Sequence, residues 1–223
     1  MIHGSTLEFL KNLAQNNNRD WFAAHKAEYQ AALENAWQSF DDVIYRLNTH
    51  DRIETPSAKN ALYRIYNDMR FAKDDTPPYN PRFAGHFSRT KPLLRGGYYL
   101  WIQPGASRVG CGFVYPNAGD LKTIRLDILK NHGKWKRLLG SKGIKATFGE
   151  IQGEQVGTAP RGFPKDHPAI DLLRHKQFWF ERSFTDREVL AKGFIDEVNR
   201  TYKSIRPFFD YMSDVLTADA AGG

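Results

Sequence analysis

The spacing of the apolar residues changes near residue 61, and this change limits what the chain can fold into. Before it, apolar side chains recur at intervals of three, four or seven residues, which is typical of amphipathic helices. After it come short segments that are rich in β-branched or aromatic residues and are bounded by Pro and Gly. Helical spacing then returns near residue 120. This order predicts an α+β fold rather than regular alternation of strands and helices.

Helical spacing predicts helices over residues 6–15, 19–48 and 120–130, a helical turn over 134–139, and a C-terminal helical region over 185–216. Ser5 with Glu8 and Thr185 with Glu188 have the spacing of capping boxes, and Pro207 is expected to kink or split the last helix. The second helix has an apolar stripe of Phe22, Tyr29, Leu33, Trp37, Phe40, Ile44 and Leu47.

The predicted strands cover residues 62–71, 82–88, 98–103, 109–115, 144–150 and 177–184. A short helix is expected to open at Pro168, with Asp166 as its cap. These elements predict a mainly antiparallel sheet flanked by N-terminal, central and C-terminal helices. We expect a single domain over residues 1–216, because no linker or repeat interrupts the chain, and a disordered tail over 217–223.

Composition excludes several classes of protein. The chain has no apolar run of the roughly 18 residues that a membrane helix needs, and its N-terminus lacks the pattern of a signal peptide. We therefore expect a soluble, cytoplasmic protein without a membrane partner. The single cysteine, Cys111, lies between two glycines, and we expect a buried thiol rather than a nucleophile. The histidines show no metal-ligand spacing and no cofactor motif is present, so neither a metal nor a cofactor is predicted.

The net charge of +7 is concentrated in the middle of the chain. Residues 61–145 contain 16 Lys and Arg against 5 Asp and Glu, an excess of +11, whereas 1–60 contain 6 against 8 and 146–223 contain 10 against 12. A local positive field attracts phosphate groups, carboxylates or a nucleic-acid backbone. The alternative is that the lysines near residue 140 form a solvated helix end.

The segment from Arg64 to Tyr79 contains the strongest group of candidate binding residues. If 62–71 is a strand, Arg64, Asp68 and Arg70 share one face, and Ile65, Met69 and Phe71 face the core. Arginine forks suit carboxylate or phosphate, so these residues predict an anion site. Its candidate ligand-binding residues are Arg64, Asp68, Arg70, Lys73, Asp74, Tyr79, Arg161 and His167. The alternative is an Arg–Asp network that only covers a sheet face.

Four motifs give the chain a family resemblance. They are N-N-N-R-D-W-F at 16–22, R-I-Y-N-D-M-R-F-A-K-D at 64–74 with Pro78-Tyr79 after it, Y-Y-L-W-I-Q-P-G and G-C-G-F-V-Y-P within 98–116, and P-R-G-F-P-K-D-H-P at 160–168. In these motifs the chain resembles an uncharacterised bacterial and fungal family, domain of unknown function 2461. The resemblance implies one continuous domain and no particular activity, cofactor or catalytic residue.

Three functions remain open from the residues. The first is binding or chemistry on a small anionic ligand in a basic, aromatic-walled cleft. The second is nucleic-acid binding by the basic middle region, with Tyr98, Tyr99 and Trp101 as stacking groups, although alternation spreads these rings over both faces of a strand. The third is a structural or interaction domain without a small ligand. The pattern does not decide whether the protein is an enzyme.

Overall fold

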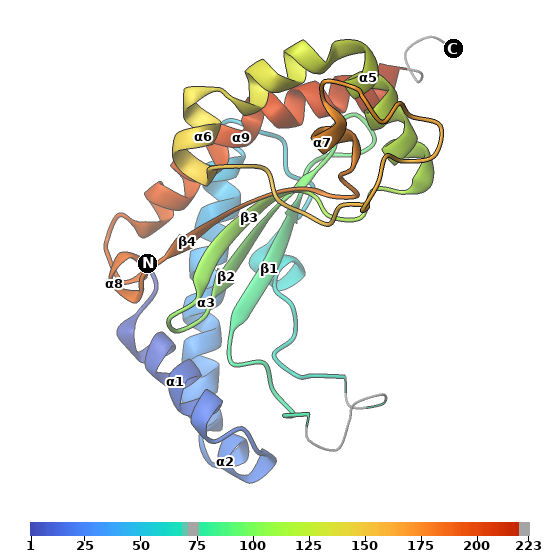
Figure 1. The fold of residues 1–223 in the computed structure, drawn as a ribbon. Coiled ribbons are helices and arrows are strands. Elements are labelled where there is room, and N and C mark those ends of the chain that lie inside the picture. Colours follow the sequence, from blue (N-terminus) through green and yellow to red (C-terminus); the bar gives the residue numbers. More distant parts are fainter. Residues whose placement is uncertain (69, 71–75, 219–223) are drawn as a thin grey trace. The chain divides into compact units, whose positions relative to one another are not determined.

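The computed structural model describes residues 1–68, 70 and 76–218. Its strands are β1 (Phe83–Ser88), β2 (Gly97–Ile102), β3 (Ser107–Phe113) and β4 (Phe178–Phe184). The helices of the described residues are α1 (Gly4–Gln15), α2 (Arg19–Ala24), α3 (Lys26–Leu47), α4 (Ala58–Ala61), α5 (Ala118–Leu139), α6 (Lys142–Phe148), α7 (Ile170–Leu173), α8 (Asp186–Val189) and α9 (Phe194–Thr217). Figure 1 follows them along the chain.

The strands form one antiparallel sheet in the order β1-β2-β3-β4. A tight turn over residues 103–106 joins β2 to β3, whereas the connection from β3 to β4 contains α5, α6 and α7. Helices thus precede, interrupt and follow the strands in the sequence. The prediction of an α+β fold with a mainly antiparallel sheet is confirmed, including the positions of these four strands.

The residues gather into two compact units, each built from separate stretches of the chain. The first unit contains residues 1–87, 99–109 and 183–200, and the second contains 88–98, 110–182 and 201–223. The predicted domain extent of 1–216 stays a prediction. Of the predicted tail, α9 includes Thr217, and residues 219–223 lie outside the described part of the chain.

In the first unit, α1 packs along α3 (Figure 1). Leu7, Leu10 and Leu13 are buried, at the helical spacing that predicted this element. The predicted capping box of Ser5 and Glu8 is wrong, because α1 begins at Gly4. Its first turn is instead bound from α3, where Asn35 Oδ1 accepts hydrogen bonds from the backbone N–H of His3 at 2.9 Å and from the hydroxyl of Thr6 at 2.8 Å.

The single helix predicted over 19–48 is two helices, α2 and α3, which meet at His25. Asn18 caps α2 by accepting the backbone N–H of Trp21 at 2.9 Å. The predicted apolar stripe is partly wrong, since Trp37 is only half-buried. The ammonium of Lys59 lies over its ring, with Nζ 4.8 Å from the ring centroid. The buried face of α3 is shifted toward smaller side chains and comprises Ala32, Asn35, Ala36, Ser39, Phe40, Val43, Ile44 and Leu47.

Strand β1 lies unusually close to its neighbours in the first unit. A Cβ atom on Gly85 would lie 2.8 Å from the carbonyl oxygen of Ala61 and 2.8 Å from the ring of Phe40. Phe40 also packs on Phe87 with ring centroids 5.6 Å apart. Glycine at position 85 therefore allows β1 to approach the core of this unit, which fixes the position of the strand.

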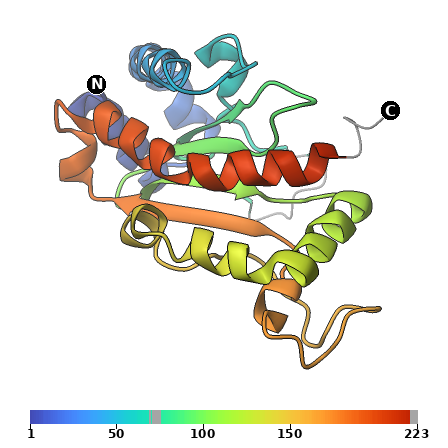
Figure 2. The same ribbon diagram turned by 90° about the horizontal axis from the view of Figure 1, so that it is seen from above.

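In the second unit, a carboxylate joins the two parts of α5 to α9. Asp127 accepts hydrogen bonds from Asn131 Nδ2 at 2.7 Å, Trp135 Nε1 at 2.7 Å and the hydroxyl of Tyr211 at 2.5 Å. Asn131 has non-helical dihedral angles, and Figure 2 shows the change of direction in α5. Burial raises the pKa of the Tyr211 hydroxyl, and the hydrogen bond to Asp127 raises it further. Because all these groups are bonded, we assign this network a structural role.

One predicted element of the second unit is wrong, and another begins later than predicted. Residues 142–148 form helix α6 instead of a strand, because Ile144 and Phe148 are buried at a spacing of four residues. The helix expected at Pro168 is α7, which starts at Ile170, and Asp166 does not cap it. Cys111 is fully buried as predicted, and burial raises the pKa of its thiol.

The C-terminal predictions are mostly confirmed. Thr185 and Glu188 form the predicted capping box at the start of α8. Pro207 does not split the last helix, since α9 runs from Phe194 to Thr217 through it. Among the described helices, none combines the length and the apolar character required to cross a lipid bilayer.

Candidate functional site

The segment predicted as a strand over 62–71 does not form one in the part of the chain that the structure describes. Leu62 and Tyr66 make isolated β-bridges to Gly85 and Tyr79, and the residues between them have irregular structure. Ile65 is buried as expected, whereas Met69 and Phe71 lie outside the described residues. We call residues 64–80 the charged loop, without positions 69 and 71–75.

Asparagine side chains hold the base of the charged loop. Asn17 clamps the backbone of Tyr79, because its Nδ2 donates to the carbonyl oxygen at 2.8 Å and its Oδ1 accepts the N–H at 3.1 Å. Asn67 donates from Nδ2 to the carbonyl oxygen of Pro77 at 2.7 Å. Asn80 donates its backbone N–H to the carbonyl oxygen of Ile65 at 2.7 Å. The base of the loop is therefore ordered by contacts between distant parts of the sequence.

The charged side chains predicted to bind an anion lie on the surface of this loop. Arg64, Asp68 and Arg70 are exposed, and Lys73 and Asp74 lie outside the described residues. Arg70 makes a two-pronged contact with Asp68, in which Nε donates to Oδ1 at 2.9 Å and Nη2 donates to Oδ2 at 2.6 Å. The guanidinium holds the pKa of Asp68 below its usual value. Part of the fork of Arg70 is thus already occupied by a carboxylate from its own loop.

Tyr79 is placed differently from the prediction. We expected it to form a wall of the ligand site, but it is only 6% exposed. Its ring stacks on Phe22 with centroids 4.1 Å apart and an interplanar angle of 13°. Burial raises the pKa of its hydroxyl. Tyr79 therefore contributes to the aromatic core beneath the loop. This packing gives the Pro78-Tyr79 part of the second motif a structural role.

Arg161 and His167 belong to the second unit and are not among the residues that the first unit brings together. Arg161 is exposed. His167 packs edge-to-face on His132 with centroids 5.1 Å apart, and its Nδ1 accepts the backbone N–H of Ala169 at 3.2 Å. The contacts of His167 are thus all with residues of the second unit. In the described residues, no three His, Cys, Asp or Glu side chains gather closely enough to hold a metal ion.

A different group of side chains forms a continuous stack on the sheet within the first unit. We call it the aromatic row: His86 of β1, Tyr99 and Trp101 of β2, and Arg108 of β3. His86 stacks on Tyr99 with centroids 4.4 Å apart, and Tyr99 lies nearly parallel to Trp101, at 5.7 Å and 11°. The guanidinium of Arg108 lies 4.7 Å from the ring of Trp101. All four side chains are half-buried, so each is held by packing and reaches solvent.

The chemistry of the aromatic row suits an anion. Arg108 carries a permanent positive charge, and the indole and phenol groups can donate hydrogen bonds. Burial raises the pKa of Tyr99 to about 12, with a smaller contribution from the nearby Tyr63, so its hydroxyl keeps its proton at neutral pH. The ring faces contact one another within the stack, and the parts of the rings that reach solvent add an aromatic surface against which another flat group can pack. The row thus combines hydrogen-bond donors and aromatic faces on adjacent strands.

Sequence reasoning missed the aromatic row as a unit. It identified Tyr99 and Trp101 but grouped them with Tyr98, which is fully buried on the opposite face of β2. The alternation of side chains along a strand already separates Tyr98 from the other two. His86 and Arg108 could not be added, because their positions beside β2 depend on the register of three strands.

Comparisons with known proteins identify the family. The model of a family described as conserved hypothetical protein (DUF2461) matches residues 5–211, and the chain belongs to this family. No curated protein and no solved structure matches the chain. The family match confirms the resemblance drawn from the four motifs.

Proposed function

We propose that this protein binds a small anionic ligand that carries a flat ring, with the aromatic row as its binding surface. The observation that carries the proposal is the stack of His86, Tyr99 and Trp101 that ends at the guanidinium of Arg108. The anion, a carboxylate or a phosphate, pairs with Arg108, and the ring of the ligand packs against the part of the indole that reaches solvent.

The charged loop supplies the second part of the proposal. The loop follows Tyr63, which lies close enough to Tyr99 of the row to raise the pKa of its hydroxyl. Arg64 and Arg70 are exposed on the loop, and Asp68 offsets the charge of Arg70. We assign the cations of the loop long-range attraction of the anion rather than contact. The excess of +11 over residues 61–145 acts in the same direction.

Isothermal titration calorimetry with phenyl phosphate and inorganic phosphate tests this function. We expect phenyl phosphate to bind more tightly, because only its ring can stack. Arg108→Gln should weaken both ligands by about tenfold or more, and Trp101→Leu should abolish the preference for the ring. Arg187→Gln on the exposed surface of α8 is the matched control. Absence of binding, or equal affinities in all variants, contradicts the proposal.

A second candidate function is binding of single-stranded nucleic acid. It is favoured by one observation: the nearly parallel rings of Tyr99 and Trp101 lie on the same strand face, where successive bases can stack. Fluorescence anisotropy of a labelled oligothymidine at increasing salt distinguishes the two functions. Nucleic-acid binding predicts an affinity that falls linearly on logarithmic axes and that Trp101→Leu weakens. Binding of phenyl phosphate without binding of the oligonucleotide favours the small ligand.

A further inference from the structure

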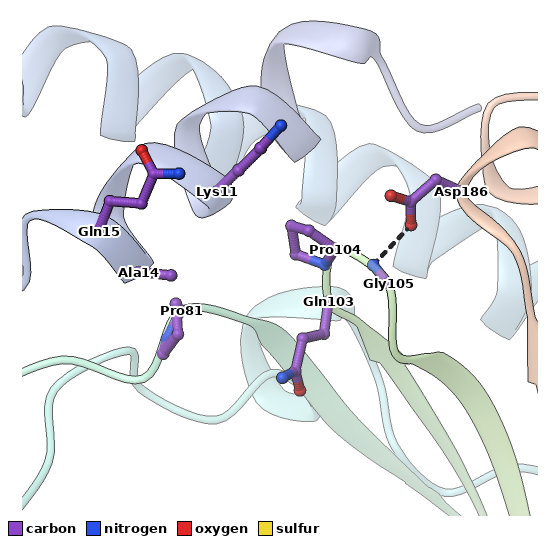
Figure 3. A pocket seen from close by; sticks show the side chains of 8 residues that line it. All are labelled: Lys11, Ala14, Gln15, Pro81, Gln103, Pro104, Gly105 and Asp186. Atoms are coloured by element: carbon purple, nitrogen blue, oxygen red, sulfur yellow. Dashed lines mark hydrogen bonds between the residues drawn. The ribbon is translucent and has the colours of Figure 1, made fainter.

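A pocket in the first unit lies between elements that are far apart in the sequence (Figure 3). Its volume is about 370 Å³, within the range of roughly 300–1,000 Å³ that is usual for small-molecule sites. One wall comes from α1, another from the turn between β2 and β3, and a third from the start of α8. None of its lining residues belongs to the aromatic row or to the predicted anion site.

The walls of the pocket are fixed by hydrogen bonds and packing. Asp186 accepts the backbone N–H of Gly105 at 2.8 Å, which ties α8 to the turn. Within the turn, the hydroxyl of Ser107 donates to the carbonyl oxygen of Gln103 at 2.9 Å and accepts the N–H of Gln103 at 3.0 Å. On the opposite side, α1 is anchored by its buried leucines. The pocket is therefore pre-formed by these elements.

The charges around the pocket have opposite signs. Lys11 on α1 supplies an ammonium group, and in the described part of the chain no carboxylate forms an ion pair with it. Asp186 supplies a carboxylate, of which only one oxygen takes part in the bond to Gly105 (Figure 3). The amides of Gln15 and Gln103 provide further donors and acceptors.

The remaining lining is apolar and consists of Ala14, Pro81 and Pro104. A ligand that complements this pocket carries a carboxylate for Lys11, an ammonium group for Asp186 and an apolar part for the alanine and the prolines. A simple anion would meet the carboxylate of Asp186, and a simple cation would meet Lys11. We propose that this pocket is a second binding site, which takes a small zwitterion with an apolar side chain, as in a free amino acid or a short peptide.

Calorimetric titration with leucine, N-acetylleucine and leucinamide tests the proposal. Leucine has both charges, whereas the two derivatives have only the carboxylate or only the ammonium group. We expect leucine to bind about tenfold more tightly than either derivative, since each derivative loses one charged contact. Dileucine, titrated in parallel, distinguishes a peptide site from an amino-acid site by which of the two binds more tightly.

Two variants assign each charge. Lys11→Met should remove the advantage of leucine over leucinamide, and Asp186→Asn should remove its advantage over N-acetylleucine. Asparagine keeps an oxygen for the N–H of Gly105, so the turn stays in place. Lys192→Met on the exposed surface of the same unit should bind leucine like the parent. Absence of saturable binding by leucine and dileucine, or unchanged preferences in both variants, overturns the proposal.

Discussion

The charged loop and the aromatic row belong to the same compact unit, yet they present their polar groups in different ways. In the loop, Arg70 is 79% exposed and Asp68 is 55% exposed, and the two side chains bind each other. In the row, Arg108 is half-buried and lies against Trp101 on a neighbouring strand. The loop has the stronger charge pattern in the sequence, but the row has the more fixed geometry.

This difference matters for binding because a ligand gains little from a group that must first be ordered. An exposed ion pair in water contributes little and is screened by salt. A side chain held by packing on a strand loses less conformational entropy when it binds. The comparison therefore assigns contact with the ligand to the row and attraction at longer range to the loop.

The largest expected effect concerns the base of the loop. Tyr79→Ala removes a ring that is buried against Phe22, and we expect a loss of about 3–5 kcal/mol in the free energy of unfolding. Urea denaturation followed by circular dichroism measures this loss. Tyr79→Phe is the control, since it keeps the ring. A loss from Tyr79→Ala below about 1 kcal/mol would show that the loop does not depend on this core.

The next effect concerns the stacking surface of the row. Trp101→Ala should weaken binding of phenyl phosphate by about 1–3 kcal/mol, the usual contribution of an aromatic stacking partner. The half-buried Trp37 of α3, which lies under Lys59, provides the control variant Trp37→Ala. Calorimetric titration of phenyl phosphate into both variants compares their affinities with that of the parent. If Trp37→Ala weakens binding as much as Trp101→Ala does, the row is not the specific surface.

A smaller effect concerns Tyr99 and pH. Because its pKa is raised from 10.0 to about 12 in the folded protein, the unfolded chain releases the phenol proton first as pH rises. Tyr99 therefore stabilises the fold fully below about pH 10, and this contribution is lost between about pH 10 and 12. Urea midpoints across this window should fall more steeply for the parent than for Tyr99→Phe. Parallel curves would contradict the raised pKa.

The smallest expected effect concerns Arg70. Arg70→Met leaves Asp68 in contact with water, so no buried carboxylate is left without a partner and the melting temperature should not change. The alternative of an Arg–Asp network that covers a sheet face would instead predict severe destabilisation, because a buried Asp68 would lose its partner. Differential scanning calorimetry in low salt checks this. A large fall in melting temperature would show that the pair has a structural role despite its exposure.

The success of sequence reasoning depended on how far apart the interacting residues lie. The capping box of Thr185 and Glu188 was predicted because both partners are within one turn. The similar pattern at Ser5 failed, since Asn35 from α3 binds the first turn of α1 instead. For the same reason, the described residues of the strand predicted over 62–71 belong to a loop whose base is held by Asn17 and by other distant contacts.

The candidate site shows the same limit. Alternation along β2 separates Tyr99 and Trp101 from Tyr98, and that part of the row could be derived from the sequence. The addition of His86 and Arg108 requires the pairing of β1, β2 and β3, which no local pattern contains. Likewise, the sequence singles out Tyr79 as a candidate binding residue, but only its packing on Phe22 shows that its ring belongs to the core.

The most direct test of the assignment compares two arginines in one titration. The dissociation constant of phenyl phosphate is measured for the parent, Arg108→Gln and Arg70→Gln at the same salt concentration. The aromatic row as the binding surface predicts an increase of about tenfold or more for Arg108→Gln and a small change for Arg70→Gln that disappears as salt is raised. A large, salt-resistant increase for Arg70→Gln with no change for Arg108→Gln would contradict it and place the ligand on the charged loop.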